Sequence, residues 1–422
     1  MTPSLSDFLV VPQRPGGLRP SRQTLANGVV VLSKESPKTP AVTIQITVKA
    51  GSIGDPDDHL GTACLVGRVL DRGTATRAAA EIAEGLEDRG ASLAITVARH
   101  FTSLSCTCLA TDVDQILALL ADIVMTPSFP DAELAIQRGE LVTQIKQDAD
   151  NPAVRAMEGL MALVYGPTHL YGRPAKGTAE SIERLPREVL QAFHQARFSP
   201  HDVIVAIVGA IAPSRAADAA AAAFGAWTHP AAPVVSVPPV PHSVTRRQVV
   251  LPMMNKSQAD IAYGFTTISR SDPDYYAFWL LNTAVGQYAM GGRLGENIRE
   301  RQGMAYYAMS VFDANVAPGP FVVRAGVSAA NVERTIRAID DELHQLLFAG
   351  LSQQELDDSR QYLIGSLPRT LETNAGIAQF LVACEFFGLG VDYDERLLDL
   401  LGAVTLTQVR DLARRHLSLI HI

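Results

Sequence analysis

The chain has 422 residues, of which 36 are Lys or Arg and 44 are Asp or Glu, so its formal net charge is −8. Hydrophobic residues make up 47% of it, and the length exceeds the roughly 250–300 residues at which a single core stops growing. The acidic balance argues against a nucleic-acid-binding protein, no apolar run is long enough to span a bilayer, and four scattered cysteines make neither a disulfide scaffold nor a thiolate zinc site.

The first half of the chain alternates strand and helix patterns. Apolar and polar residues alternate over 42–48, which predicts a half-buried strand. An Ala-rich helix is predicted over 78–88, ended by Gly90. Cys106 and Cys108 lie two apart in an alternating stretch, so we expect buried structural thiols on one face of a strand. Similar patterns predict strands over 91–96, 102–109 and 203–208, and helices over 113–125 and 130–149.

A proline-rich segment divides the chain into two similar lengths. Residues 230–241 contain five prolines, which disfavour helix interiors and central strands. We therefore predict a linker over 230–244, between an N-terminal domain over 1–229 and a C-terminal domain over 245–416.

The second half repeats the order of elements in the first. The segment GLEDRGASLAI around Gly90 is similar to NIRERQGMAYYA around Gly303, since both place a glycine between a charged helix end and a strand. We infer two copies of one α+β unit from this order. The patterns predict strands over 261–266, 305–311 and 321–327, and helices over 275–288, 293–301, 331–348 and 353–364.

The two ends of the chain need separate treatment. The N-terminal residues lack the basic and apolar regions of a signal peptide, which favours a cytoplasmic location, or a periplasmic one if the natural start lies upstream. Residues 417–422 match the translation of a sequencing adapter. We expect this tail to be an artefact, with the natural chain continuing differently after His416.

Short motifs follow one another in a fixed order along the chain. They are Ala50-Gly51-Ser52, Gly61-Thr62-Ala63, Arg72-Gly73-Thr74, Asp150-Asn151-Pro152, Tyr171-Gly172-Arg173-Pro174, Gly177-Thr178 and Phe198-Ser199-Pro200. In this order they resemble the pitrilysin–insulinase family of zinc metallopeptidases, in particular its mitochondrial processing peptidase type and bacterial relatives. The resemblance implies two homologous peptidase-like units, each an antiparallel-rich sheet with helices packed on one face.

The resemblance also shows which site residues have changed. Active members carry H-x-x-E-H on a helix, which puts two zinc-binding His on one face beside the Glu that activates water. The preceding and following motifs place this slot at residues 64–68, where Cys64 and Arg68 replace the ligands and Gly67 replaces the base. The third ligand, 76 residues after the second His, falls on Gln144. A guanidinium repels a divalent cation, so we expect no metal in this chain and no peptide hydrolysis by the chain alone.

A second element of the family is retained in the C-terminal half. Arg299 and Tyr306 have the spacing of its R-x6-Y pair, with a helix end, Gly303 and a strand start between them. In the family this pair reaches the zinc site, where a guanidinium and a phenol are suitable donors to an oxyanion and to substrate backbone. The simpler interpretation is a solvated arginine and a strand tyrosine with an exposed hydroxyl.

The sequence thus favours a non-catalytic subunit of a heteromeric zinc peptidase. A homologous partner would carry H-x-x-E-H and the zinc, and this chain would contribute Arg299, Tyr306 and half of a chamber for a peptide substrate. The alternative is an inert scaffold or peptide-binding protein, similar to the core subunits of the respiratory cytochrome bc1 complex.

Overall fold

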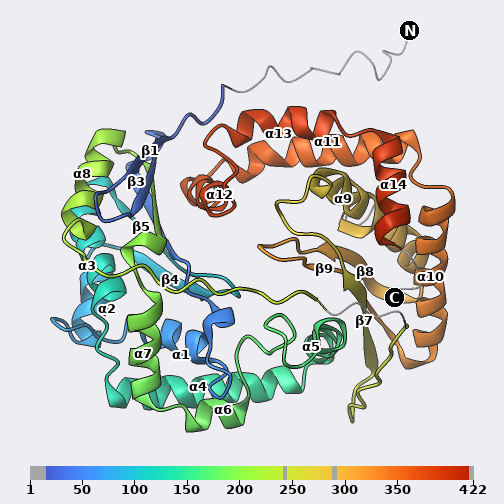
Figure 1. Cartoon of the computed structure of the whole chain (residues 1–422), viewed down its shortest axis with the longest axis horizontal. Coiled ribbons are helices and arrows are strands. Elements are labelled where there is room, and N and C mark those ends of the chain that lie inside the picture. The colour runs from blue at the N-terminus through green and yellow to red at the C-terminus, as the bar shows by residue number, and fades with distance from the viewer. Residues whose placement is uncertain (1–15, 241–244, 288–291, 418–422) are drawn as a thin grey trace.

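The computed structural model describes residues 16–240, 245–287 and 292–417 (Figure 1). The end of the predicted linker, residues 241–244, and the suspected tail from Ser418 onward lie outside these residues. Two sheets lie in the middle of the molecule, and most helices surround them (Figure 1).

The first sheet has six strands in the order β1-β2-β6-β3-β5-β4. Only β2 and β6 pair in parallel, and the other neighbours are antiparallel. The four strands predicted in this half are confirmed, whereas β1 and β2 were not predicted. The strands are β1 (Ser21–Thr24), β2 (Val30–Glu35), β3 (Ala41–Val48), β4 (Ser92–Val97), β5 (Thr102–Leu109) and β6 (Val203–Gly209).

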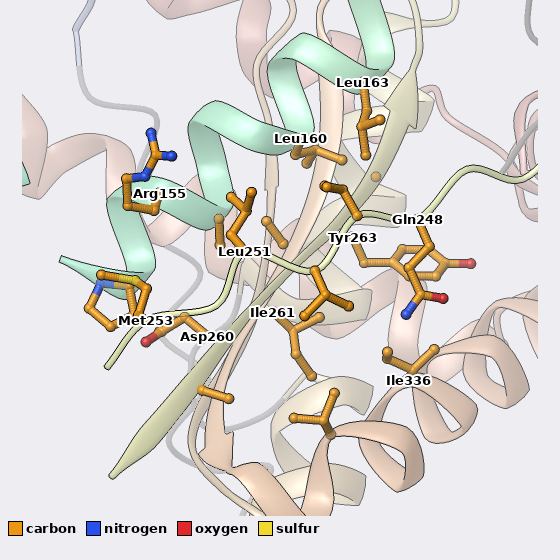
Figure 2. Close-up of a pocket in the computed structure, with 18 of the residues that line it drawn as sticks. Arg155, Leu160, Leu163, Gln248, Leu251, Met253, Asp260, Ile261, Tyr263 and Ile336 are labelled. Carbon is orange, nitrogen blue, oxygen red and sulfur yellow. The ribbon is translucent and has the colours of Figure 1, made fainter. Parts of the chain in front are cut away.

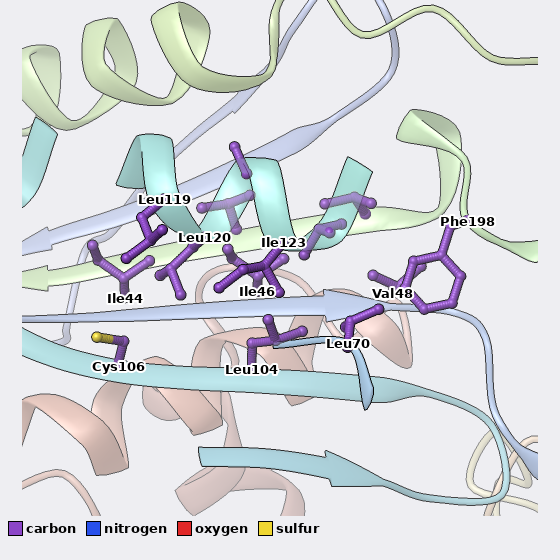
Figure 3. Packing of buried hydrophobic residues seen from close by; sticks show 14 of the residues in the cluster. Ile44, Ile46, Val48, Leu70, Leu104, Cys106, Leu119, Leu120, Ile123 and Phe198 are labelled. Carbon is purple, nitrogen blue, oxygen red and sulfur yellow. The ribbon is translucent and has the colours of Figure 1, made fainter. Parts of the chain in front are cut away.

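Helices of the same half cover one face of this sheet. The alternation in β3 turns Ile44 and Ile46 toward the buried face of α3, where they meet Leu120 and Ile123 (Figure 3). Cys106 and Cys108 are both buried, as predicted. The helices are α1 (Thr62–Val69), α2 (Ala79–Glu87), α3 (Val113–Met125), α4 (Asp131–Ala149), α5 (Pro152–Tyr165), α6 (Ala179–Arg184), α7 (Arg187–Arg197) and α8 (Pro213–Phe224).

The second sheet is smaller among the described residues. Its strands β7 (Gln258–Thr266), β9 (Pro320–Ser328) and β8 (Ala305–Phe312) pair antiparallel in the order β7-β9-β8. The helix predicted over 275–288 is α9 (Tyr275–Asn282) followed by a π-helical turn over 283–287, and the one predicted over 293–301 is a π-helical segment over 295–301. The remaining helices are α10 (Val332–Phe348), α11 (Gln353–Thr370), α12 (Asn374–Phe386), α13 (Tyr393–Gly402) and α14 (Leu406–His416).

Each half covers the other half's sheet with one helix. Apolar residues of α12, among them Leu381, form a cluster with Ile204 and Val208 of β6, on the face of the first sheet that α3 leaves open. In the same way α5 packs on β7 of the second sheet. The helices predicted on one face are therefore joined by one exchanged helix on the other. No helix in the described part of the chain is long and apolar enough to cross a membrane.

Candidate functional site

The residues of the predicted zinc slot lie on α1, whose start is fixed by a buried carboxylate. Gly61 precedes the helix with φ of 89°, and Asp55 accepts backbone N–H groups of Gly61 at 2.7 Å and of Ala63 at 2.8 Å. These donors would be unpaired at a bare helix start. Burial raises the pKa of Asp55 to about 7, although the two N–H groups favour the carboxylate.

Arg68, in the last turn of α1, bridges this helix to α4. Its Nη2 donates to Gln144 Oε1, and its Nη1 lies 3.6 Å from Glu140 Oε2. Gln144 and Glu140 share one face of α4, because they are four residues apart. The structure thus brings together two of the four positions that the sequence analysis singled out, and a covalently attached cation lies where α1 faces α4.

The position of the predicted base is filled by a neighbouring strand. A Cβ atom added at Gly67 would lie far inside van der Waals contact with Cγ2 of Val97, on β4. Val97 is β-branched, with few rotamers in which to move away. A longer side chain at residue 67 therefore requires that Val97 shift or shrink.

Cys64 completes the slot as a neutral thiol. Burial raises the pKa of this thiol despite the nearby positive charges of Arg68 and Lys176. Lys176 itself is paired with Asp148 of α4, 2.6 Å away. Sequence reasoning missed Glu140, Val97 and Lys176. The four-residue spacing from Gln144 was a usable signal for Glu140, whereas nothing local in the sequence pointed to the other two.

The Arg/Tyr pair lies in the second half, on the elements that the sequence predicted. Arg299 is in the π-helical segment over 295–301, where its Nε donates to Glu300 Oε1 at 2.9 Å. Tyr306 lies on the edge strand β8 and is 85% exposed. Ala305 pairs with Val327 and Tyr307 with Gly326, so Tyr306 is the extra residue of a β-bulge. Bulges redirect a side chain away from the regular alternation.

Comparison with protein families gives this geometry a context. The model of the Insulinase family (peptidase family M16) matches residues 30–173, and that of the peptidase M16 inactive domain matches residues 184–363. The chain belongs to the M16 peptidase family. The two matches also follow the order of the two halves, since the first contains α1 and the second contains Arg299 and Tyr306.

The relatives of this M16 chain extend over most of its length. An uncharacterized zinc protease of Bacillus subtilis, YmxG, is 25% identical over 93% of this chain and 95% of its own length. A probable mitochondrial-processing peptidase subunit beta of Arabidopsis thaliana is 24% identical over 84% of this chain and 68% of its own. A crystal structure of a peptidase M16 inactive domain from Pseudomonas fluorescens is 28% identical, with a TM-score of 0.88 and 96% of each chain covered. A Helicobacter pylori protease has the same fold, with a TM-score of 0.86 at 16% identity.

The zinc that the names of such M16 relatives imply does not fit the residues of this slot. Zinc sites use thiolate, imidazole or carboxylate donors, whereas here the slot holds a neutral thiol, a glycine, a guanidinium and an amide. Among the residues that the structure describes, no group of three or more His, Cys, Asp or Glu side chains is placed to hold a metal ion. The positive charge of Arg68 opposes a dication at the same place.

Proposed function

We propose that this chain is a non-catalytic subunit of a heteromeric zinc peptidase of the M16 family. A homologous partner would supply the H-x-x-E-H helix and the zinc. This chain would supply Arg299, Tyr306 and part of the wall of the peptide chamber. The bridge from Arg68 to Gln144 and Glu140 carries the proposal, because it places a fixed cation and two α4 side chains where an active member would hold its metal.

The role given to Tyr306 rests on its position. A tyrosine that is 85% exposed on an edge strand contributes little to the core, so packing does not account for it. A phenol can donate one hydrogen bond to the oxyanion that develops during attack on a peptide carbonyl. Arg299, whose guanidinium has further donors beyond the Nε bonded to Glu300, can hold the substrate backbone.

The test is to express the chain alone and together with a homologous H-x-x-E-H subunit, and to measure zinc content and cleavage of a peptide. We expect activity only in the mixture. Tyr306→Phe should lower kcat of the mixture by about 100-fold, the usual cost of one oxyanion donor, and Arg299→Ala should raise KM. Zinc-dependent cleavage by the isolated chain would overturn the proposal.

Two matched variants serve as controls. Tyr307→Phe removes the neighbouring phenol, which donates to Asp260, and Arg301→Ala removes an exposed arginine paired with Glu296 in the same segment. Both should leave kcat and KM of the mixture unchanged. If the Tyr306 and Arg299 variants behave like these controls, the pair has no part in the reaction. A complex that forms normally but is indifferent to both residues supports the alternative function, an inert scaffold.

A further inference from the structure

A groove runs along the edge strand β7 of the second sheet. Its volume is about 360 Å³, with β7 residues 258–264 on one side and the extended segment 246–251 on the other (Figure 2). Leu160 and Leu163 of α5 line it together with Ile336 of α10. In the described sheet β7 pairs with β9 alone, so the backbone N–H and C=O groups along its other edge face this groove.

The internal repeat shows what such a groove accepts. Strands β3, β5 and β4 of the first sheet correspond in order and antiparallel pairing to β7, β9 and β8 of the second. In the first sheet, β6 fills the edge of β3 and β2 lies beyond it. The segment 246–251 takes the place of β2, so the groove is the place of one strand. β6 is buried along its whole length and reads Val-Ile-Val-Ala-Ile-Val-Gly.

The exchanged helices support this correspondence. In the first half, α12 packs its apolar side chains on Ile204, Ala206 and Val208 of β6. In the second half, α5 directs Leu160 and Leu163 into the groove (Figure 2). The seat prepared by α5 therefore has the apolar character of the one that α12 offers to β6.

A second cavity extends the groove to the other end of β7. It has a volume of about 580 Å³ and is lined by residues 264–267 of β7, by 237–240 and by Arg415 and His416. Leu160, Leu163, Arg247 and Gly264 line both cavities, so together they follow the full strand. In the first half β6 runs antiparallel to β3, with Val203 opposite Val48. An occupant with the same direction would start near Thr266 and end near Gln258.

The charges along the groove differ from those of the whole chain. The chain has a net charge of −8, yet the lining of the two cavities contains five arginine or lysine side chains and a single carboxylate, Asp260. The cations are Arg155, Arg246, Arg247, Lys256 and Arg415. Since an apolar floor lies between basic rims, charge complementarity favours an occupant with an aliphatic centre and acidic flanks.

We propose that this groove is a strand-acceptor site for an extended segment of a partner protein. The segment has β-branched and aliphatic residues in its centre and acidic residues at its flanks, and it runs antiparallel to β7. Its backbone would complete the hydrogen bonds along the edge of β7, and its side chains would pack on α5. The site is separate from Tyr306, which lies on β8 at the opposite edge of the sheet, and it does not depend on the proposed peptidase role.

The probe is a fluorescent peptide with the sequence of β6 and two glutamates at each end, added to the full chain. We expect saturable binding by anisotropy, together with slower amide hydrogen exchange in residues 258–266. A peptide with alternate N-methylated residues should not bind, because it cannot pair with β7. A peptide flanked by lysines should bind about tenfold more weakly, because the basic rims repel it.

Two protein variants localise the binding. Leu163→Glu places a negative charge in the groove and should weaken binding of the glutamate-flanked peptide about tenfold or more, owing to the like charges and the lost apolar contact. Ala162→Glu, one residue away on α5 and outside the lining of both cavities, should bind as the parent does. Thermal unfolding of both variants checks that they fold.

Several results would overturn the proposal. One is the absence of binding by the folded parent chain, and another is binding that Leu163→Glu leaves unchanged. Slow exchange of the β7 amides in the protein alone, independent of its concentration, would show that the chain fills its own groove. Exchange that slows as the protein concentration rises would assign the groove to a second copy of the chain.

Discussion

At the scale of single residues, the slot on α1 has lost its metal chemistry and gained a polar bridge. Arg68 joins Gln144 and Glu140 across the helix pair, while Val97 takes the space of the base. A metal ion and a guanidinium are both cations held between the same two helices. The substitution therefore keeps an electrostatic link between α1 and α4 but removes the Lewis acid.

Restoring the ligands should restore metal binding without restoring activity. Because residues 68 and 144 are in contact and residue 64 is one turn before 68, the variant Cys64→His/Arg68→His/Gln144→Glu should retain about one zinc per chain. A zinc concentration 100-fold above Kd should stabilise the fold by about 2.7 kcal/mol. Zinc content and thermal unfolding with and without a chelator measure this.

The matched control is Cys64→His/Arg68→Lys/Gln144→Glu, which retains a cation at residue 68 and should hold no zinc. Neither variant should cleave peptides, since residue 67 has no side chain to act as a base. A folded triple variant that retains no more zinc than the control would show that the three positions do not form a site.

Buried histidines should make the fold sensitive to acid. Burial lowers the pKa of His194 from 6.5 to about 4, where its Nε2 lies 2.8 Å from Val124 O. Between these values the unfolded chain binds a proton that the folded chain does not. The contribution to the free energy of unfolding is therefore complete above pH 6.5 and decreases as the pH falls toward 4.

Urea unfolding at a series of pH values tests this effect. His194→Gln should flatten the decrease between pH 6.5 and 4, and Gln191→Asn, exposed on the same helix, should not. The comparison with the parent isolates His194 from Asp55, whose raised pKa acts in the opposite direction. Parallel curves for the parent and His194→Gln would contradict the assignment.

At the scale of elements, the exchanged helix α12 stabilises a sheet to which it does not belong in sequence. Leu381 is buried at the contact with β6. Leu381→Ala should lower the free energy of unfolding by about 2–5 kcal/mol, measured by urea unfolding. Hydrogen exchange should increase in β6 and β3 of the other half.

Val391→Ala provides the control, because this residue is 37% exposed and should cost less than about 0.5 kcal/mol. Equal effects of the two substitutions would mean that α12 does not support the first sheet. Faster exchange confined to the second half would mean the same.

The sequence predicted elements where one face alone decides the pattern. The alternation of β3 places its limits within one residue, because one side chain in two meets α3. β1 was missed because four mostly exposed polar residues have no such pattern, and α12 was missed because its apolar residues surround the helix, which lies between the two halves. In the site, counting residues placed Arg68 and Gln144 correctly as neighbours. Val97 could not be predicted, because its contact with Gly67 depends on how β4 packs on α1.

At the scale of the whole molecule, several contacts join the halves besides the chain between them. Helices α5 and α12 are exchanged, and at the N-terminal end Arg22 makes two bonds of 2.8 Å to Glu385 while the backbone N–H of Leu18 donates to Asp394. The connection over the proline-rich segment is therefore not what holds the halves together.

Cutting the chain within that segment should leave the halves associated. A protease site inserted after Val234, which is 95% exposed, should give two fragments that co-elute in gel filtration. They should separate only in denaturant, because each exchanged helix loses its apolar contacts on separation. An uncut protein with the same insertion is the control, and separation in native buffer would contradict the expectation.

The bulge on β8 has a consequence for how freely residue 306 can vary. Ala305 and Tyr307 each have a partner on β9, and the residue between them is opposite none. Sheet pairing thus sets no requirement on the size or polarity of this side chain. An aromatic residue held at a structurally neutral position answers only to what it touches outside the chain, so substitution tolerance at 306 directly reports whether the exposed phenol has a use.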